Sequence, residues 1–559
     1  MEDITKKYKK YKLHPSNENI KELCQPKKFK LQPQQLFLPE YLNDNIKNIN
    51  GLLIYHRIGS GKTCTAINIA EKFKKKYNIM IVLPAALIGN FRDELISNCP
   101  GKNVYITESE NKKIKEINHK SVEYKELIMN INKRIEKYYT IYSYHKFIEL
   151  VQENKIKLKN TILIIDEIQN MISMKGTFYR ILKNIINKTD KKTIKIFLLS
   201  ATPMFDHPGE IALTLNLLRP NILLPIGNDF NNTFLVPTHN NNYKPTNLKL
   251  FKELTTNLIS YYRGSSPIAF PKMEFKVVRC NMSNFQYKSY LTSLSKLDDN
   301  IKGFFKDVDL LNLPGDFFLG PRMISNIAFP NKSIGDIGFS SFTDNKLKKI
   351  KNYSIKFYKI FKKIKKSYGP IFVYSNFKEI GGLKPFIKFI EYNGYKSYKI
   401  FGEGPKRYAI WSGDEPHHIK EEIKYIYNNK DNYNGSKIKI ILGSPSIKEG
   451  VSLLRVEQIH ILEPYWNLSR IQQIIGRGVR FCSHKDLPKK KQIVKVYLYL
   501  STHVKEDVSI DQYIWSIAKK KYKLIEEFEH VLKENAIDCK LFHARNYYKS
   551  DERKLICNK

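Results

Sequence analysis

Short apolar segments rich in β-branched residues recur between longer amphipathic stretches, and this alternation most constrains the fold. In the first half of the chain they are GLLIY (51–55), IMIVL (79–83), TIYSY (140–144), ILII (162–165) and IFLL (196–199). In the second half they are IFVYS (371–375), IKIIL (438–442), IHIL (459–462) and IVKVYLYL (493–500). Such runs, separated by helical stretches, are typical of buried parallel strands joined by crossover helices. The sequence therefore predicts an α/β protein with two tandem parallel-sheet lobes.

The pattern weakens at the ends of the chain and between the two blocks, which sets the expected domain boundaries. Residues 1–30 carry nine lysines against four acids and little periodicity, so we expect a flexible or loosely docked basic arm. From the positions of the apolar runs we predict a first lobe at 31–225, an insertion or linker at 226–345, a second lobe at 346–504 and a helical extension at 505–559.

The second lobe opens with KLKKIKNYSIKFYKIFKKIKK (346–366), which holds ten lysines and no acid. Its apolar side chains fall near helical spacing, at Leu347, Ile350, Phe357, Phe361 and Ile364. This pattern predicts an amphipathic helix with a basic outer face. That face could contact phosphates or simply be solvated.

The charge balance is unusual, because 95 Lys and Arg residues stand against 54 Asp and Glu residues, a formal net charge of +41. Such an excess favours a polyanionic partner, most simply nucleic acid, whose phosphates bind cations and release counterions. Compositional drift from an AT-rich genome is the alternative, since Lys, Asn, Ile and Tyr are all abundant.

Cysteine usage and hydropathy bear on the compartment. The seven cysteines are scattered without a C-x-x-C pair, so neither a zinc site nor a disulfide framework is predicted, and a reducing compartment fits. There is no apolar run near 18 residues and no signal-peptide pattern. We therefore expect a soluble intracellular protein without a membrane partner.

The segment YHRIGSGKT (55–63) resembles the end of a phosphate-binding loop, with His56 where the pattern asks for its first glycine. Backbone N–H groups around Gly59, Ser60 and Gly61 would converge on phosphates, and Lys62 would neutralise their charge. The Thr63 hydroxyl would bind Mg²⁺. A predicted strand precedes the loop and a predicted helix follows it, as a nucleotide site requires.

Two adjacent carboxylates, Asp166 and Glu167, follow the apolar run ILII. The carboxyl end of a parallel strand is where a nucleotide-bound Mg²⁺ needs a carboxylate. Asp166 would hold the ion, and Glu167 would orient and deprotonate the attacking water. An ordinary polar strand end is the alternative.

The segment RIQQIIGRGVR (470–480) contains Arg477 and Arg480, three residues apart and therefore on one face if the segment is helical. Arginine is always charged and forks onto phosphate oxygens. Both could act as arginine fingers that complete the γ-phosphate site from the second lobe. They could equally be a pair of surface arginines.

Taken in order, these segments resemble superfamily-2 helicase-like ATPases, most closely the SWI/SNF-type branch. LQPQQLFL (31–38) looks like the adenine-reading segment with Gln35 as reader, and Gln473 falls in an ATP-binding motif. VLPAALIGNFRDEL (82–95) and SYHKF (143–147) resemble segments that lie along nucleic acid. The coupling residues implied by LSATPM (199–204) and GSPSIKEGVSLL (443–454) are Ser200, Thr202, Glu449 and Gly450. DEIQ (166–169) departs from the commoner DEAD and DEAH forms at Gln169.

A narrower likeness to the transcription ATPases of poxviruses and other large nucleocytoplasmic DNA viruses runs through 201–220, 461–488 and 510–539. These include the small subunit of the early transcription factor and nucleoside triphosphatase I. The resemblance implies RecA-like lobes, Mg²⁺ with ATP, and a nucleic-acid translocase serving viral transcription initiation or termination. It also implies a viral RNA polymerase or transcription-factor subunit as partner, and a place in the host cytoplasm or the virion.

Three functions remain open from the sequence. The leading hypothesis is a DNA-dependent ATPase translocase, and translocation is favoured over unwinding because no separate strand-separating domain is visible. The alternatives are an RNA helicase and a polymerase-associated assembly factor that uses ATP as a conformational switch. Two histidine sites are expected to be structural: His417 and His418 at a helix start, and His484 after the arginine motif.

Overall fold

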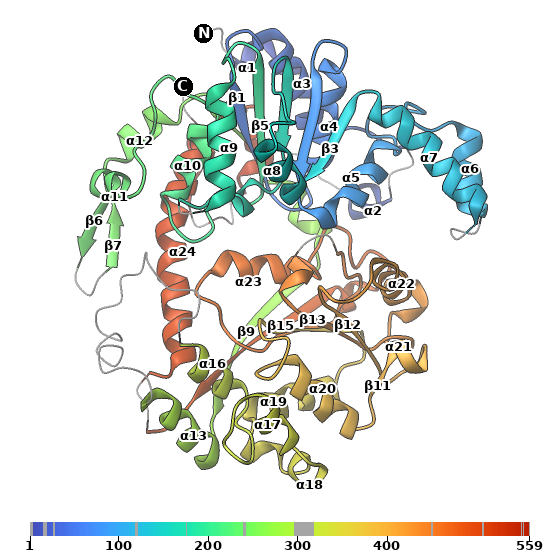
Figure 1. Ribbon diagram of the computed structural model, residues 1–559, viewed down its shortest axis with the longest axis vertical. Helices are drawn as coiled ribbons and strands as arrows, with labels where there is room; N and C mark the ends of the chain where they lie inside the picture. The colour runs from blue at the N-terminus through green and yellow to red at the C-terminus, as the bar shows by residue number, and fades with distance from the viewer. Residues whose placement is uncertain are drawn as a thin grey trace. The chain divides into compact units, whose positions relative to one another are not determined.

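The computed structural model describes residues 4–14, 19–25, 28–117, 121–174, 176–238, 242–295, 318–448, 451–505, 508–548, 551 and 553–557 (Figure 1). The chain divides into two compact units. Unit 1 comprises 1–236, 243–266 and 524–559, and unit 2 comprises 237–242 and 267–523. Each unit contains one parallel sheet. The predicted α/β class with two parallel-sheet lobes is confirmed.

The sheet of unit 1 has six parallel strands in the order β3-β2-β4-β5-β1-β8. Its strands are β1 (Gly51–His56), β2 (Asn78–Leu83), β3 (Tyr139–Ser143), β4 (Thr161–Ile165), β5 (Ile194–Ser200) and β8 (Ile259–Tyr262). The first five coincide with the predicted apolar runs to within two residues. Because β4 and β1 lie on either side of β5, their carboxyl ends share one edge of the sheet, where the candidate site residues follow.

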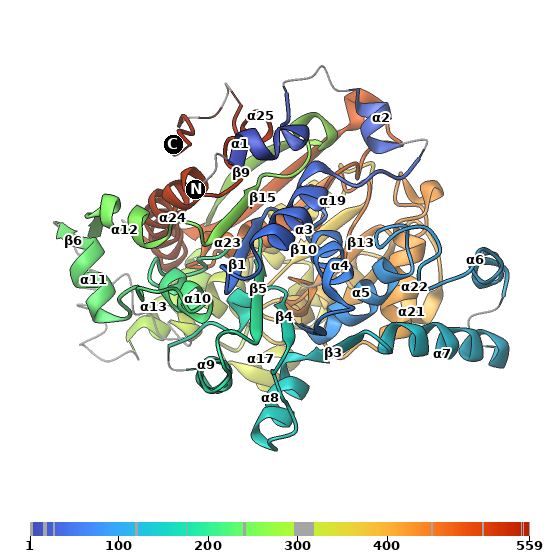
Figure 2. The ribbon, with the colours of Figure 1, turned by 90° about the horizontal axis from the view of Figure 1, so that it is seen from above.

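Helices cover both faces of this sheet, as Figures 1 and 2 show. On one face lie α3 (Pro33–Asn45), α4 (Lys62–Phe73) and α5 (Ile88–Leu95), whose apolar side chains share a core with the sheet. On the other lie α9 (Thr177–Lys188) and α10 (Glu210–Leu217). Further α-helices of this unit are α1 (Ile4–Lys7), α2 (Ile20–Cys24), α8 (Tyr144–Gln152), α11 (Asn228–Phe234), α12 (Leu248–Leu254) and α25 (His543–Asn546).

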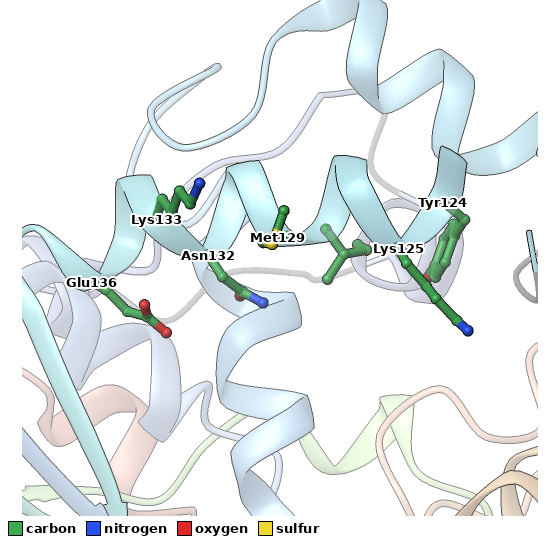
Figure 3. Close-up of a pocket in the computed structure, with 7 residues that line it drawn as sticks. Tyr124, Lys125, Met129, Asn132, Lys133 and Glu136 are labelled. Carbon is green, nitrogen blue, oxygen red and sulfur yellow. The ribbon is translucent and has the colours of Figure 1, made fainter. Parts of the chain in front are cut away.

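Two helices between β2 and β3, α6 (Glu108–Glu116) and α7 (Val122–Glu136), project from the β3 edge of the sheet (Figure 2). One side of α7 lines an open hollow of ≈ 440 Å³. Figure 3 shows Lys125, Asn132 and Glu136 pointing to the same side of this helix. Asn132 and Glu136 accept hydrogen bonds from Arg92 of α5, at 2.5 and 3.2 Å. The projecting helix therefore positions an arginine of the segment that was expected to lie along nucleic acid.

The described part of the N-terminal arm is docked, contrary to expectation. Tyr8 is 2% exposed, packs edge-on against Phe37 at 5.2 Å, and donates a hydrogen bond to Asp44 at 2.9 Å. The backbone N–H of Leu13 also bonds the carbonyl of Leu541. The prediction was based on the many lysines of the arm and did not take the burial of Tyr8 into account.

Unit 2 contains a seven-stranded parallel sheet in the order β11-β12-β13-β10-β14-β15-β9. Its strands are β9 (Lys272–Asn281), β10 (Ile371–Tyr374), β11 (Lys396–Ser397), β12 (Arg407–Trp411), β13 (Ile440–Gly443), β14 (Gln458–Ile461) and β15 (Ile493–Thr502). A further two-stranded sheet pairs β6 (Leu235–Thr238) with β7 (Asn242–Pro245).

One face of the seven-stranded sheet packs on α19 (Ile355–Ile364) and α20 (Leu383–Tyr392), and the other on α22 (His417–Tyr427) and α23 (Leu468–Ile475). The single helix expected over 346–366 is broken into α18 (Asp344–Leu347), a 3-10 turn and α19. Its apolar positions are all buried as predicted, and the Ser354 hydroxyl caps α19 at the break. Other helices of this unit are α13 (Asn284–Ser295), α16 (Leu319–Asn326), α17 (Gly335–Ser340) and α21 (Tyr398–Phe401).

The segments expected to be a linker and a C-terminal extension form part of the two compact units. Residues 226–345 supply β8 to one sheet and β9 to the other. The division of the chain falls inside α24 (Ile510–Glu534), and its last part packs in unit 1, where Phe528 contacts Phe230 and Phe251 with ring centroids 5.7 and 5.1 Å apart. The described part of the tail after 505 therefore contributes buried residues to the two units and does not form a separate extension.

The structure contains bonded cysteines, where the sequence predicted no disulfide framework. Cys64 is joined to Cys99, and Cys539 to Cys557. Sequence spacings of 35 and 18 residues gave no motif from which these pairs could be predicted. Within the described residues no helix combines the length and apolar character needed to cross a membrane.

Candidate active site

The predicted phosphate-binding loop joins the end of β1 to the start of α4 at Lys62. Gly59 and Gly61 adopt the left-handed backbone region, with φ of 81° and 73°. A side chain at Gly61 would also collide with the Gln35 amide. Both positions therefore favour glycine because of their backbone conformation, and a side chain at Gly61 would in addition displace the Gln35 amide.

His56, which stands in place of the first loop glycine, is fully buried and has a structural role. Its Nε2 lies 3.0 Å from the Ser260 hydroxyl, and that hydroxyl donates to the Asp538 carboxylate at 2.5 Å. Asp538 also accepts the backbone N–H of Tyr261 at 2.9 Å. Burial, reinforced by the charge of Lys62, lowers the pKa of His56 to about 3, so the ring is neutral. His56 thus ties the loop to β8 and the C-terminal segment.

The Asp538 carboxylate should make the stability of the fold depend on pH. Burial raises its pKa from 3.8 to about 7, against the opposing hydrogen bonds from Ser260 and Tyr261. A carboxyl with a raised folded-state pKa stabilises the protein below its unfolded pKa, and this contribution is lost as pH rises through 7. The free energy of unfolding of wild type relative to Asp538→Asn should therefore fall between pH 5 and 7 and level off above.

Urea unfolding at each pH measures this difference, with the exposed Asp229→Asn as the matched control. A difference between wild type and Asp538→Asn that does not change with pH would contradict the assignment. His56 titrates in the opposite sense, so the comparison must be with the variant rather than with the wild-type profile alone.

Lys62, Asp166 and Glu167 converge, as the sequence predicted. The Lys62 ammonium lies 2.7 Å from a Glu167 oxygen and 3.5 Å from an Asp166 oxygen, and its side chain is 12% exposed. Burial works to lower the pKa of Lys62, but the attraction of the two carboxylates outweighs it and the pKa is raised. The cation is therefore held charged at the carboxyl ends of β1 and β4, where a phosphate chain needs it.

A hydrogen-bonded chain connects the carboxylate motif to the coupling motif. The Gln169 amide donates to Glu167 at 2.6 Å, its oxygen accepts from the Ser200 hydroxyl at 2.7 Å, and Ser200 accepts the backbone N–H of Thr202 at 3.0 Å. Gln169 was noted in the sequence only as a departure from the commoner motifs. Its place, two residues after Glu167, is the signal from which this bridging role could have been found.

Removing this bridge should impair turnover. In Gln169→Leu, Glu167 and Ser200 each lose a hydrogen-bond partner, and bonds to charged groups contribute roughly 1.5–3 kcal/mol. We expect ATP turnover to fall at least about tenfold, while nucleotide affinity changes little. Steady-state phosphate release and nucleotide titration test this, with the exposed Gln152→Leu as control. ATP turnover of Gln169→Leu equal to that of wild type would show that the hydrogen bonds of Gln169 do not orient Glu167.

Two glutamines of α3 lie against the phosphate loop. Gln35 Nε2 donates to the Gly61 carbonyl at 3.1 Å, and Gln34 Nε2 donates to the Ser60 carbonyl at 2.9 Å. The Gln35 side-chain oxygen also accepts the backbone N–H of Gln32 at 2.7 Å, closing the first turn of the helix. The predicted adenine-reading residue is therefore beside the loop, and Gln34 is a second contact that the sequence analysis missed.

The residues expected to hold Mg²⁺ offer the donors that this ion prefers. Asp166 is 5% exposed, and Thr63 follows Lys62 in the first turn of α4. Burial raises the pKa of Asp166, while the neighbouring Lys62 opposes that rise. A carboxylate and a hydroxyl are hard oxygen ligands, and a buried carboxylate is stabilised by a bound cation. The donor set therefore fits Mg²⁺, which would supply charge neutralisation at the phosphates.

In unit 2 the arginine motif lies at the end of α23. Arg477 and Arg480 both donate to the Val451 carbonyl at 3.3 Å, and Arg477 also donates to the carbonyl of Gln473. The helix ends at Ile475, so the arginines lie in the turn beyond it and not on a helical face. They converge nonetheless, because they share an acceptor. The predicted coupling residues Glu449 and Gly450 lie outside the described residues.

The two histidine sites behave as predicted. His417 is the first residue of α22. His484 is buried, with its ring nitrogens 2.8 Å from the Ser483 hydroxyl and 2.9 Å from the Val456 carbonyl. Burial lowers its pKa to about 4.

Residues 34–314, half of the chain, match the SNF2-related domain family. With the strand-end positions of Lys62, Asp166 and Glu167, this match defines the class: the chain belongs to the SNF2-related family and is a superfamily-2 helicase-like nucleoside triphosphatase.

Its relatives come from large DNA viruses. A protein of Acanthamoeba polyphaga mimivirus, which carries the provisional name ATP-dependent RNA helicase R563, is 49% identical over 558 residues, covering 99% of this chain and 96% of the relative. The provisionally named helicase 087L of Invertebrate iridescent virus 3 is 28% identical, covering 94% of this chain and 55% of the relative. An African swine fever virus protein, named a homologue of the termination factor NPH-I, is 26% identical, covering 88% of this chain and 77% of the relative.

Proposed function

We propose that this ATPase is a translocase on DNA that couples ATP hydrolysis to viral transcription, at initiation or termination. The observation that carries the proposal is the chain of contacts from Lys62 through Glu167 and Gln169 to Ser200. It links the phosphate-binding, carboxylate and coupling motifs in one direct path. A change at the triphosphate can therefore alter the position of the Ser200–Thr202 segment.

The site residues have the following roles in this proposal. Lys62 binds the triphosphate, Thr63 and Asp166 hold the Mg²⁺ that comes with ATP, and Gln35 reads the adenine. Glu167 orients the attacking water and accepts its proton. Arg477 and Arg480 stabilise charge on the γ-phosphate, which arginine does through its fixed fork of donors.

Net charge and the names of the relatives support the proposed polymer and cellular step. A net charge of +41 favours a polyanion, and the relative named as a termination factor homologue favours a transcriptional role. The partner would be a viral RNA polymerase or transcription-factor subunit, and the place of action the host cytoplasm or the virion.

ATP turnover without nucleic acid and with single-stranded DNA, double-stranded DNA or RNA tests the choice of polymer. Double-stranded DNA should stimulate turnover at least about tenfold, equivalent to ~1.4 kcal/mol of the barrier, and RNA should not. Stimulation by RNA alone would overturn the assignment to DNA.

An RNA helicase is the second candidate, because a relative 49% identical to this chain carries that name. This function predicts stimulation by RNA and separation of an RNA duplex with a single-stranded overhang. The same four-polymer comparison, followed by a strand-separation assay, distinguishes the two.

A further inference from the structure

Edge strand β9 carries an apolar face to the surface of unit 2. It pairs with β15 at the end of the sheet, and Figure 1 shows the two strands side by side. Met273, Phe275 and Val277 project on one face and are 47%, 36% and 40% exposed. Their register partners on β15 (Val494, Val496 and Leu498) are fully buried. The apolar layer of the sheet therefore continues beyond the core without cover from the described residues.

An aromatic pair lies on this face. The rings of Phe275 and Trp515, from the first part of α24, are stacked with centroids 6.0 Å apart and an interplanar angle of 27°. Beside them is a hollow of ≈ 330 Å³. The hollow is lined, entirely within unit 2, by Val277, Arg279, Leu500, Gln512, Trp515 and Lys519.

The rim of the hollow is cationic. Arg279 and Lys519 are exposed, and the Lys519 ammonium lies 6.0 Å from the Trp515 ring centroid. Among the residues that the structure describes, no acidic side chain lines the hollow. A flat ring with flanking cations matches a base and its phosphates, because every base presents a π-face and the backbone carries one charge per nucleotide.

We infer that this β9–α24 surface is an auxiliary binding site for single-stranded polynucleotide. One base stacks on Trp515 next to Phe275, Arg279 and Lys519 contact the flanking phosphates, and the Gln512 amide lies where it can bond a base edge. The contacts recognise base planes and backbone, so DNA and RNA strands can both bind. This inference rests on the proposed function, because the β9–α24 surface would be a second contact with the nucleic acid along which the ATPase moves.

Intrinsic tryptophan fluorescence of the full chain tests the site, because its other two tryptophans, Trp411 and Trp466, are buried at 6% and 8% exposure. Titration with oligothymidylate and, separately, oligouridylate should quench the emission of Trp515. Arg279→Ser/Lys519→Ser should weaken single-strand binding about tenfold and lower the slope of log K against log salt by about 1.4, from ~0.7 per phosphate contact. Phe275→Ser should reduce quenching without loss of folding, since the side chain lies on an edge strand.

The matched control is Lys399→Ser/Lys406→Ser, which removes the same charge near the opposite edge of the sheet and should bind like wild type. Equal affinity and salt slope for the two double variants would overturn the site, as would absence of quenching or stronger quenching by an oligoglutamate peptide. Quenching retained by Lys62→Ala supports a site separate from the nucleotide. Quenching in a chain whose ATPase no polymer stimulates would leave this site standing while the proposed function fails.

Discussion

Replacing Glu167 by Gln is expected to lower ATP turnover about a thousandfold, within the roughly 10²–10⁴-fold that a positioned general base contributes. The amide keeps the shape of the side chain and can still face Lys62 and Gln169, whose contacts with Glu167 are 2.7 and 2.6 Å. It cannot accept the proton of the attacking water. Binding of ATP should therefore survive while its hydrolysis does not.

Steady-state phosphate release at saturating nucleic acid measures turnover, and titration with a fluorescent ATP analogue measures binding. Glu149→Gln is the matched control, because Glu149 is an exposed acid on α8 whose loss should change neither quantity. Turnover of Glu167→Gln within a few-fold of wild type would assign the general base to another residue.

Replacing Lys356 by Met should destabilise unit 2 by about 3–5 kcal/mol, the cost of leaving a buried charge without its partner. Lys356 and Asp511 are 0% and 1% exposed and lie 2.6 Å apart. Lys356 also donates to Asn326 at 2.8 Å, and Asn326 donates to the buried Glu463 at 2.9 Å. Burial raises the pKa of Glu463, against the attraction of Lys356. Without the Lys356 ammonium, the carboxylates of Asp511 and Glu463 remain buried without this cation to offset the cost of their desolvation.

Urea unfolding measures this cost, and Lys362→Met, an exposed lysine of the same helix, is the control. The double variant Lys356→Met/Asp511→Asn should recover part of the loss, because it removes one of the two buried carboxylates that Lys356→Met leaves without this cation and keeps the volume of the side chain. A single variant within about 1 kcal/mol of wild type would show that water reaches this pair.

Local sequence was sufficient to locate most strands and to predict that Lys62, Asp166 and Glu167 lie together. The runs at 51–55 and 162–165 are apolar and β-branched because those strands are buried on both faces, and the site residues follow them directly. Strand β9 escaped prediction for the opposite reason. As an edge strand it alternates exposed apolar residues with Lys272, Glu274 and Lys276, and so reads as a polar linker.

Long-range contacts could not be predicted. His56 looks like a relaxed glycine position in the sequence, but its partners Ser260 and, through it, Asp538 lie 204 and then a further 278 residues along the chain. Lys356 counted as one of ten lysines on a basic helix, although it is buried against Asp511. Lysine is usually exposed, so the local sequence does not indicate when a lysine is buried beside a carboxylate that is distant in the chain.

The proposed function requires that hydrolysis at Lys62 and Glu167 moves the protein along DNA. Displacement of a third strand from a DNA triplex tests movement without requiring separation of the duplex strands. Wild type with ATP should release the third strand, whereas wild type with a non-hydrolysable analogue and Glu167→Gln with ATP should not. A wild-type protein that hydrolyses ATP on the same DNA but leaves the third strand bound would contradict the account.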